Sequence, residues 1–321
     1  MKSQTVDEIM ACLPYGKTHF RYYPGAYAPR LLSLLIPEQM RLKKLKQTRF
    51  KRLLEHKNLR DVVASSGGGI LHREALDAVW QEPSQPFLLS LCRWGSNTER
   101  DYHQTSRFGE NLVLQLNLPK VSQRKFKEWI NPDSTLTGSW SYHPVQLPYK
   151  NPLFRDTLAW SRIDLDFRHN EALIEEVQSD SVRDVRRWAR RYRRCGCKRC
   201  RQRLLFVDWF DNYANIWSEA LLMATIWFIN QELGIERIYM HTARSGWQVK
   251  KMCKSVHAPR SLYSDLPRKF AFKRTWAAPE FLLETRCYKQ LIRKQPDIDF
   301  YQLSMDELKN QFASELRRAA A

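Results

Sequence analysis

The sequence contains no uninterrupted apolar stretch of the length that a membrane-spanning helix requires. Its most apolar stretch, residues 216–229, is interrupted by Ser218, Glu219 and Thr225, whereas about 18 or more apolar residues in a row are needed to cross a bilayer. The first eight residues also lack the hydrophobic core of a secretory signal. We therefore expect a soluble cytoplasmic protein with no membrane partner.

Cysteine and glycine are scarce as well. The seven cysteines are an odd number, and inside the cell they indicate free thiols or a metal site rather than a framework of disulfides. The longest glycine run, Gly67–Gly69, is not followed by the Gly-Lys-Ser or Gly-Lys-Thr of a phosphate-binding loop. We interpret this run as a turn, which excludes a P-loop nucleotide site there.

Positive charge, in contrast, is abundant and concentrated in two segments. The formal net charge is +19. Residues 183–203 contain eleven Lys or Arg against one Asp, and residues 41–60 contain nine against one Glu. Because the rest of the chain is nearly neutral, the basicity is a local feature of these two segments and not a general means of solubility.

Residues 157–275 have the pattern of an α/β fold. From 158 to 167, apolar residues alternate with charged ones that include Arg162 and Asp164, which predicts a strand with one exposed face. A turn at 168–170 leads into a second strand, so the two form a hairpin. A helix, a strand and a helix are predicted to follow at 214–233, 235–241 and 246–255. The order β-β-α-β-α indicates one mixed sheet in an α/β (α+β) protein.

Three parts are expected along the chain. With 43% apolar residues, 15 Phe, 13 Tyr and 11 Trp, the sequence can bury a core of one large domain or two. A basic helical N-terminal region is expected at 1–80, with a helix from Pro37 to about Leu54. The other two parts are a mixed α/β core at 87–275, with a basic insertion at 181–203, and a helical C-terminal extension at 276–321.

The element order of 157–275, together with the segment Leu262–Phe272, resembles the second half of the GNAT superfamily of acyl-CoA-dependent N-acyltransferases. This resemblance implies acetyl-CoA or another acyl-CoA as the cofactor. In that family a glycine-rich loop after the central strand holds the cofactor pyrophosphate with backbone N–H groups. Residues 181–213 contain only Gly196, so arginine side chains would have to hold these phosphates instead.

A second resemblance concerns the segment Leu173–Asp180, followed by Trp217, Gly234 and Thr242. It is similar to the Glu-Glu-Ile-Gln-Ser-Asp segment of large phage and plasmid polyvalent proteins. This similarity implies a bacterial or mobile-element context and no particular reaction.

The candidate catalytic residues lie at the ends of two predicted strands. Glu175 and Glu176 are neighbours on a strand and are expected to point to opposite faces, with Glu175 beside Leu173 and Val177. A buried Glu175 would then be paired with an arginine or have the raised pKa of a general base. Polar residues that end adjacent parallel strands meet at one edge, where α/β sheets bind ligands. The candidate set is Glu175, Glu176, Gln178, Asp180, His241 and Thr242.

Residues 181–194 are predicted to form an amphipathic helix that begins at a Ser181 cap and has one apolar stripe. Guanidinium groups cover the other faces, and they suit bidentate contacts with phosphates. The alternative is an exposed basic helix paired with acidic neighbours, but Asp184 is the only acidic residue nearby. We therefore predict that nucleic acid is a partner. The predicted contacts are Arg183, Arg186, Arg187, Arg190, Arg191, Arg193, Arg194, Lys198, Arg199 and Arg201.

The three cysteines Cys195, Cys197 and Cys200 are the candidate metal ligands. Cys197 and Cys200 have the spacing of a zinc knuckle, and Cys195 is a candidate third thiolate. A redox use is the open alternative, since the surrounding cations lower thiol pKa values. The plausible sources of a fourth ligand are His241, Cys253, His257 and Cys287.

Together these patterns predict a nucleic-acid-associated α/β protein of a bacterial or mobile-element system, with GNAT-like acyl transfer as its candidate activity. The alternative is a non-catalytic nucleic-acid-binding or zinc-knuckle interaction module, for which a protein partner is also conceivable. A V-shaped split between the strand ending at Asp180 and the strand ending at Thr242 would favour the enzyme, because the acyl-CoA enters at such a split.

Overall fold

The computed structural model describes residues 1–12, 18–96, 104–129, 156–250 and 259–311. Its fold is mixed α/β, as predicted, with a large sheet in the order β1-β4-β5-β6-β7-β8-β10-β9. Every neighbouring pair in this sheet is antiparallel except β7 and β8, which are parallel. The strands are β1 (Thr18–Tyr22), β4 (Gln85–Ser96), β5 (Gly109–Asn117), β6 (Thr157–Asp166), β7 (Glu171–Gln178), β8 (Arg237–His241), β9 (Lys273–Thr275) and β10 (Phe300–Ser304).

Both ends of the chain contribute strands to this sheet. β1 pairs with β4, and β10 lies between β8 and β9. The segment 1–80 and the segment 276–321, which the sequence indicates as mainly helical, therefore each add one strand. Among the described residues, none of the helices is long and apolar enough to cross a membrane.

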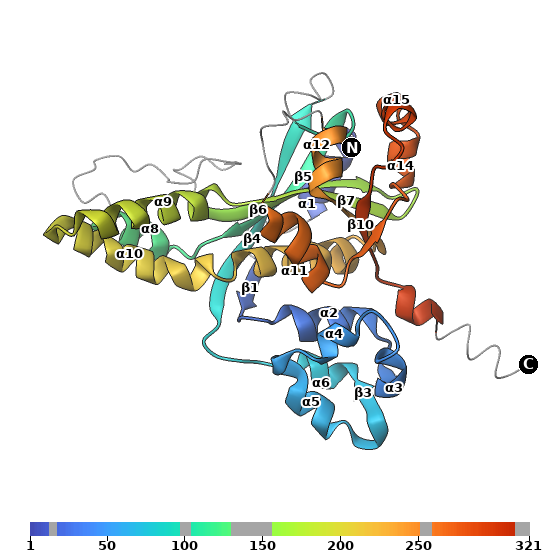
Figure 1. Ribbon diagram of the computed structural model, residues 1–321, viewed down its shortest axis with the longest axis horizontal. Helices are drawn as coiled ribbons and strands as arrows, with labels where there is room; N and C mark the ends of the chain where they lie inside the picture. The colour runs from blue at the N-terminus through green and yellow to red at the C-terminus, as the bar shows by residue number, and fades with distance from the viewer. Residues whose placement is uncertain (13–17, 97–103, 130–155, 251–258, 312–321) are drawn as a thin grey trace, which may run out of the picture.

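Helices cover both faces of the sheet (Figure 1). One face carries α11 (Trp217–Trp227), with α2 (Tyr27–Leu35) beyond it. The other face carries α12 (Ala243–Val249), α14 (Glu280–Leu283) and α15 (Arg286–Lys294). α1 (Ser3–Cys12) packs against β4 and β5.

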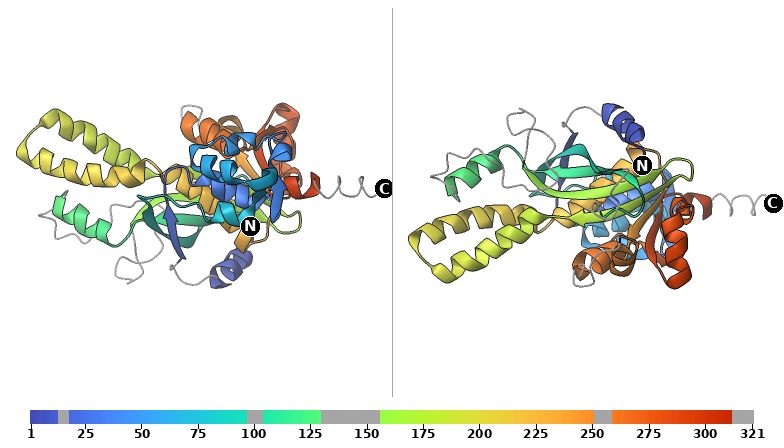
Figure 2. Two further views of the ribbon diagram at one scale, coloured as in Figure 1. Left: turned by 90° about the horizontal axis from the view of Figure 1, so that it is seen from below. Right: turned by 90° about the horizontal axis from the view of Figure 1, so that it is seen from above.

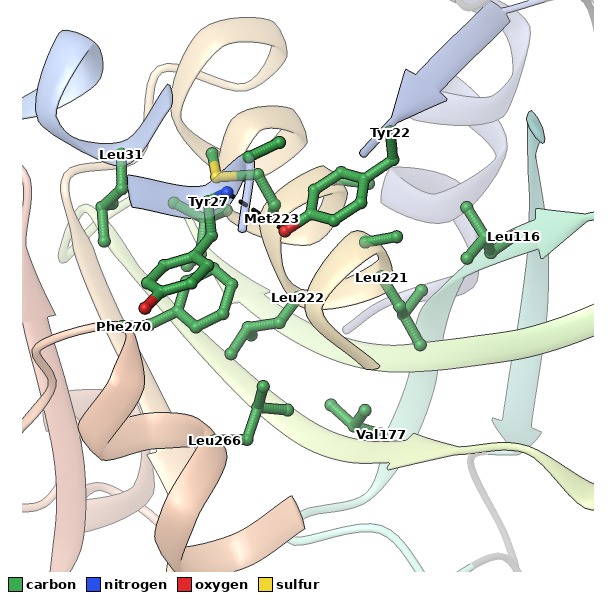
Figure 3. Close-up of a cluster of buried hydrophobic side chains, with 14 of the residues drawn as sticks. Tyr22, Tyr27, Leu31, Leu116, Val177, Leu221, Leu222, Met223, Leu266 and Phe270 are labelled. Atoms are coloured by element: carbon green, nitrogen blue, oxygen red, sulfur yellow. Dashed lines mark hydrogen bonds between the residues drawn. The ribbon is translucent and has the colours of Figure 1, made fainter. Parts of the chain in front are cut away.

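The main core lies between the sheet and α11 (Figure 3). α11 is apolar nearly all round, which is the pattern of a helix buried on every side. Leu221 and Leu222 of α11 lie among Leu116 and Val177 of the sheet and Phe270. The core therefore joins the sheet, α11 and the N-terminal helices into one packed unit.

The strand at 158–167 was predicted to have one exposed face, and this is wrong. β6 is buried on both faces along almost its whole length, with Arg162 only 2% exposed. The N-terminus and the segment before β5 cover the face that the alternation marks as polar, since the Met1 amino group donates to Asp164 and Arg162 donates to the Gln104 carbonyl oxygen. The buried charges are paired, Asp164 with Arg107 at 2.7 Å, and the Arg107 guanidinium stacks 4.2 Å from the ring centre of Phe281 in α14.

A β-bulge interrupts the pairing of β6 and β7. Ile163 pairs with Ile174, but the next residue, Arg162, pairs with Glu176. Glu175 is thus the extra residue on β7 and has no partner on β6. A bulge of this kind reverses the alternation of side chains beyond it.

The bulge places both neighbouring glutamates on the same face of the sheet. Ile174 and Val177 are three residues apart, yet both lie in the main core. Glu175 and Glu176 lie on the opposite face, where Glu175 contacts His241. The prediction that the two carboxylates point to opposite faces is therefore wrong, because it assumed unbroken alternation.

The N-terminal basic segment is also more broken than predicted. In place of one helix from Pro37, it forms β2 (Gln39–Arg41), α3 (Leu42–Leu45) and α4 (Lys51–Leu54), and β2 pairs with β3 (Ile70–His72) in a second small sheet. The side chain of Thr48 hydrogen-bonds Leu45 O and Phe50 N, at 2.8 and 3.2 Å, and interrupts the helix between α3 and α4. The region also contains α5 (Arg60–Ser65) and α6 (Arg73–Asp77).

Beyond β7 the chain forms a long helical hairpin that extends away from the sheet (Figures 1 and 2). It consists of α9 (Asp180–Cys195) and α10 (Lys198–Ala214), and α8 (Val121–Trp129) packs against α10. We call α9 and α10 the basic hairpin. The sequence indicated its first helix but not α10, and the capping residue is Ser179, whose hydroxyl accepts the Val182 N–H, in place of the predicted Ser181.

Candidate functional site

The parallel strands β7 and β8 stop pairing before β7 ends. They pair from Glu171 and Arg237 to Ile174 and Met240. β7 continues to Gln178 on the β6 side, and β8 turns into α12 on the β10 side. The last four residues of β7 therefore have no partner on β8. This is the place where a V-shaped split between the two strands would favour an acyl-CoA enzyme.

A cavity of about 830 Å³ occupies this place between β7, α9 and α12. Its volume is within the range of about 300 to 1,000 Å³ that is typical of small-molecule sites. The wall combines cationic, amide and aromatic side chains. The polar and aromatic residues include Gln104, Glu176, Gln178, Arg183, Arg186, Arg190, Trp217, Thr242, Trp247, Lys250 and Tyr263.

The structure brings three of the six candidate catalytic residues to the cavity. Glu176, Gln178 and Thr242 line it. Glu175 and His241 are fully buried behind this wall, and they contact each other. Asp180 is the first residue of α9 instead of the last residue of the strand, and its carboxylate pairs with Arg183.

Glu175 is the centre of a buried hydrogen-bonded cluster. Its carboxylate accepts the N–H and the hydroxyl of Ser106, at 2.9 and 2.8 Å. It also lies 3.2 Å from Nε2 of His241, while Nδ1 of His241 lies 3.0 Å from the Ser245 hydroxyl. Lys250 Nζ donates to the Glu175 carbonyl oxygen at 2.8 Å. This cluster ties the bulge of β7 to β8 and α12.

Burial and hydrogen bonding set the charges in this cluster. Burial raises the pKa of Glu175, but the hydrogen bond from His241 and the charges of Lys250 and Arg162 outweigh it and lower the pKa to about 2. Burial lowers the pKa of His241. At neutral pH Glu175 is therefore a carboxylate, and a neutral His241 donates its Nε2–H to it. The general base with a raised pKa is not Glu175.

The Ser106, His241 and Glu175 side chains do not form a catalytic triad. In a triad the histidine joins the acid through one ring nitrogen and the serine through the other. Here both Ser106 and Glu175 lie at Nε2 of His241, and Nδ1 faces Ser245. The arrangement is that of a structural anchor, in which both carboxylate oxygens and the carbonyl oxygen of Glu175 accept hydrogen bonds.

The polar wall of the cavity is built around Glu176. Its carboxylate lies 2.7 Å from the Arg162 guanidinium, which is almost fully buried. Burial lowers the pKa of Lys250, as does the charge of Arg162. Burial raises the pKa of Tyr263, as does the charge of Glu176. Tyr263 thus keeps its proton and is suited to donate a hydrogen bond into the cavity.

The N-terminus of α9 faces the cavity, but the protein's own groups fill it. The Ser179 hydroxyl caps the helix, and the Asp180 carboxylate accepts from Gln178 and Arg183 in the first turn. A carboxylate at this position is stabilised by the helix dipole and opposes a second anion there. Phosphates in the cavity would be held by arginine side chains, as the shortage of glycine indicated.

The predicted nucleic-acid contacts lie on the exposed surface of the basic hairpin, and all ten are exposed. Arg183 and Arg187 pair with Asp180 and Asp184. Within the described residues, the structure gives no intramolecular ion pair to Arg186, Arg190, Arg191, Arg193 or Arg194. Four of the ten predicted contacts surround an open hollow, and we call these four the arginine patch: Arg187, Arg190, Arg191 and Arg194.

The three predicted metal ligands meet at the tip of the basic hairpin. The Sγ atoms of Cys195, Cys197 and Cys200 all lie within 4.8 Å of one another. Cys197 caps α10, and the Cys200 N–H donates to its sulfur at 3.4 Å. This hydrogen bond and the Cys195 side chain lower the pKa of Cys197 to about 7. We call these three residues the cysteine cluster.

The suggested sources of a fourth ligand do not join the cysteine cluster in the described structure. His241 belongs to the buried cluster around Glu175, and Cys287 lies in α15. Cys253 and His257 lie outside the described residues. Within the described residues, the structure brings three metal-ligating side chains together at the cysteine cluster.

Several residues of the site were missed by the sequence analysis. Arg162 was expected on an exposed face, whereas the two glutamates near its position across the hairpin could have indicated an ion pair. Lys250 and Tyr263 come from α12 and the segment before α13 (Leu266–Lys269), and Ser106 comes from the chain before β5. No periodic pattern connects these three residues with β7, because the fold alone brings them together.

The chain was compared with models of known protein families, with curated proteins and with solved structures. None of the three comparisons found a match. The function is therefore inferred from the residues and geometry described above.

Proposed function

We propose that the chain is a nucleic-acid-associated protein of a bacterial or mobile-element system that transfers an acyl group from an acyl-CoA to an amine. The observation that carries this proposal is the cavity of about 830 Å³ at the place where β7 and β8 stop pairing. The resemblance to GNAT enzymes implies that an acyl-CoA enters at such a place. The cavity also borders the basic hairpin, because Arg186 and Arg190 of α9 line it and Arg190 belongs to the arginine patch as well.

The composition of the cavity supports an anionic cosubstrate. Arg183, Arg186 and Arg190 offer guanidinium groups that bind phosphates through paired hydrogen bonds. Trp217 and Trp247 add aromatic surface to the wall, which suits the apolar part of a ligand. Cationic side chains of α9 and aromatic side chains of α11 and α12 thus line the same cavity, a combination that fits a ligand with both phosphates and an apolar part.

Two residues of the wall have suitable roles in acyl transfer. The amine nitrogen attacks the thioester carbonyl carbon, the C–S bond breaks, and the amine loses one proton. Among the described lining residues Glu176 is the carboxylate, and it is the candidate acceptor of that proton. The Tyr263 hydroxyl, whose pKa is raised by burial, stays protonated and is the candidate hydrogen-bond donor to the leaving thiolate, which then takes up the proton that Glu176 received from the amine.

Isothermal titration of the full chain with acetyl-CoA tests the cosubstrate. We expect a dissociation constant on the order of micromolar, which corresponds to about 8 kcal/mol of binding free energy. Arg186→Ala removes a guanidinium from the cavity and should weaken binding about tenfold or more. Arg187→Ala is the matched control, because it lies on the same helix but not in the cavity. No heat of binding at millimolar acetyl-CoA would refute the acyl-CoA site.

The nucleic-acid part is tested by removing the arginine patch. Replacing its four residues by alanine should weaken binding to DNA or RNA, and the slope of log K against log salt should fall by about 0.9 for each phosphate that the variant no longer neutralises. The charge-matched control is the quadruple alanine variant of Lys43, Lys46, Arg52 and Arg60, which are exposed in the other basic segment. Equal losses in both variants would show that total charge, and not the patch, determines binding.

A second candidate function is a non-catalytic nucleic-acid-binding module. The Asp180 carboxylate favours it, because this carboxylate stands in the first turn of α9, where GNAT enzymes bind the pyrophosphate. In this case the arginine-patch variant would lose nucleic-acid binding as described, while the wild-type chain would not bind acetyl-CoA. The two titrations together therefore separate the two functions.

A further inference from the structure

We propose that the cysteine cluster binds a zinc ion that fastens the tip of the basic hairpin. α9 ends at Cys195, Gly196 turns the chain with φ +65°, and Cys197 starts α10 as its N-cap. This short turn brings the Cys195 and Cys197 side chains to the same side of the hairpin tip. The buried Cys200, one turn into α10, supplies the third sulfur.

The distances between the sulfur atoms fit a zinc ion. A Zn–S bond is about 2.3 Å, so two thiolates of a tetrahedral site lie about 3.8 Å apart. The three Sγ atoms already lie within 4.8 Å of one another, and those of Cys195 and Cys197 lie 3.3 Å apart. The separations therefore differ from the tetrahedral distance by about 1 Å or less.

The surroundings of the cluster favour thiolates bound to a metal. The backbone N–H of Cys200 points at the Cys197 sulfur, as donors do around thiolate ligands. Three thiolates and one Zn²⁺ leave a net charge of −1. The exposed side chains of Lys198, Arg199 and Arg201 surround the turn and compensate this charge. A pair of redox-active thiols would need two cysteines, whereas the turn assembles three.

The site has room for a fourth ligand that the described residues do not fill. Within the described part of the chain, no further Cys, His, Asp or Glu joins the three sulfurs. Zinc completes a four-coordinate shell with water in such cases. The proposed site is therefore a three-thiolate zinc site with one position open to solvent.

Zinc at this place would stabilise the part of the hairpin that packing stabilises least. Near the sheet, α10 buries Phe206, Phe210 and Tyr213. Phe206 stacks on Phe210 and makes an edge-to-face contact with Phe126 of α8. Toward the tip, the buried side chains are those of Tyr192 and Cys200, and the Arg203 guanidinium lies over the Tyr192 ring. Metal binding there would hold the two helices together at the end farthest from the sheet, and it would fix the positions of the adjacent arginines.

The test is the metal content of the full chain, purified under a reducing agent and without a chelator. We expect about one zinc per chain by elemental analysis, and less than about one-tenth as much in the triple variant Cys195→Ser, Cys197→Ser and Cys200→Ser. Cys287→Ser is the matched control, because Cys287 lies in α15 outside the cluster, and it should retain the full content. A chain that contains no zinc and does not take up added Zn²⁺ in competition with a chromophoric chelator would overturn the proposal.

A second measurement keeps the result interpretable if the triple variant folds poorly. Co²⁺ added to the reduced wild-type chain should produce a thiolate-to-metal charge-transfer band with the intensity of three sulfur ligands. Zinc should also slow proteolysis of the arginine-rich tip, and a chelator should reverse this protection. A disulfide within the cluster in protein that shows neither the cobalt band nor this protection would assign the thiols to redox chemistry instead.

Discussion

Replacing Glu175 by glutamine removes the charge at the centre of the cluster that ties β7 to β8. Glutamine keeps the shape of the side chain and one acceptor oxygen, but its NH₂ group replaces the other oxygen. Either the Ser106 N–H, or the Ser106 hydroxyl together with His241 Nε2, would then face a donor. The pKa of Glu175 is lowered from 4.5 to about 2, and each pKa unit corresponds to about 1.36 kcal/mol. The charged form therefore stabilises the fold by about 3 kcal/mol, which we expect Glu175→Gln to lose at neutral pH.

The pH dependence follows from the direction of the shift. A carboxyl group whose folded pKa lies below its unfolded pKa binds fewer protons in the folded chain. Its stabilisation is complete above pH 4.5 and is lost as the pH falls toward 2. A protonated Glu175 resembles glutamine, so the stabilities of the wild type and the variant should converge through this window.

Urea unfolding at pH 7, 5, 4 and 3 measures the difference in the free energy of unfolding between the wild type and Glu175→Gln. We expect about 3 kcal/mol at pH 7 and a smaller difference at pH 3. The exposed carboxylate of Glu8 supplies the control, and Glu8→Gln should change the free energy of unfolding by less than about 0.5 kcal/mol. A difference between wild type and Glu175→Gln that is as large at pH 3 as at pH 7 would refute the assignment of Glu175 as a low-pKa anchor.

Two further substitutions test the packing around the site. Val177→Ala removes two methyl groups from the main core, where Val177 is 1% exposed, and should lower the free energy of unfolding by about 2 kcal/mol in urea titration; an unchanged value would contradict its place in the core. Ser179→Ala removes the cap of α9 and should cost about 1 kcal/mol, with faster amide exchange confined to the first turn of α9; Ser181→Ala, at the cap that the sequence indicated, should leave that exchange nearly unchanged.

The sequence predicted those parts of the fold whose signal is local. The hairpin of β6 and β7, the helix before Gly234 and the strand at β8 follow from periodicity and from a glycine at a helix end, and the structure contains all three. The first helix of the basic hairpin was also predicted. Its partner α10 was not, because its apolar residues contact both α9 and α8, so that no single polar face remains.

The parts that the sequence did not predict depend on contacts between distant segments. The buried state of Arg162 depends on Glu176 across the hairpin and on Trp94 and Gln104 from earlier in the chain. Without the bulge, counting back from the turn would pair Arg162 with Glu175, so one inserted residue changes which carboxylate is paired with the arginine. A bulge leaves no mark on an apolar pattern as short as that of β7.

The bulge also explains how two adjacent carboxylates take different positions on one face of the sheet. Glu175, the inserted residue, turns toward β8 and is held by Ser106 and His241. Glu176 returns to the register of β6, pairs with Arg162 and lines the cavity. The first carboxylate anchors the strand beside the place where pairing stops, and the second is left at the cavity wall. Deleting Glu175 would restore plain alternation and keep Glu176 opposite Arg162, so this deletion would remove the anchor of the strand without moving Glu176 to the other face.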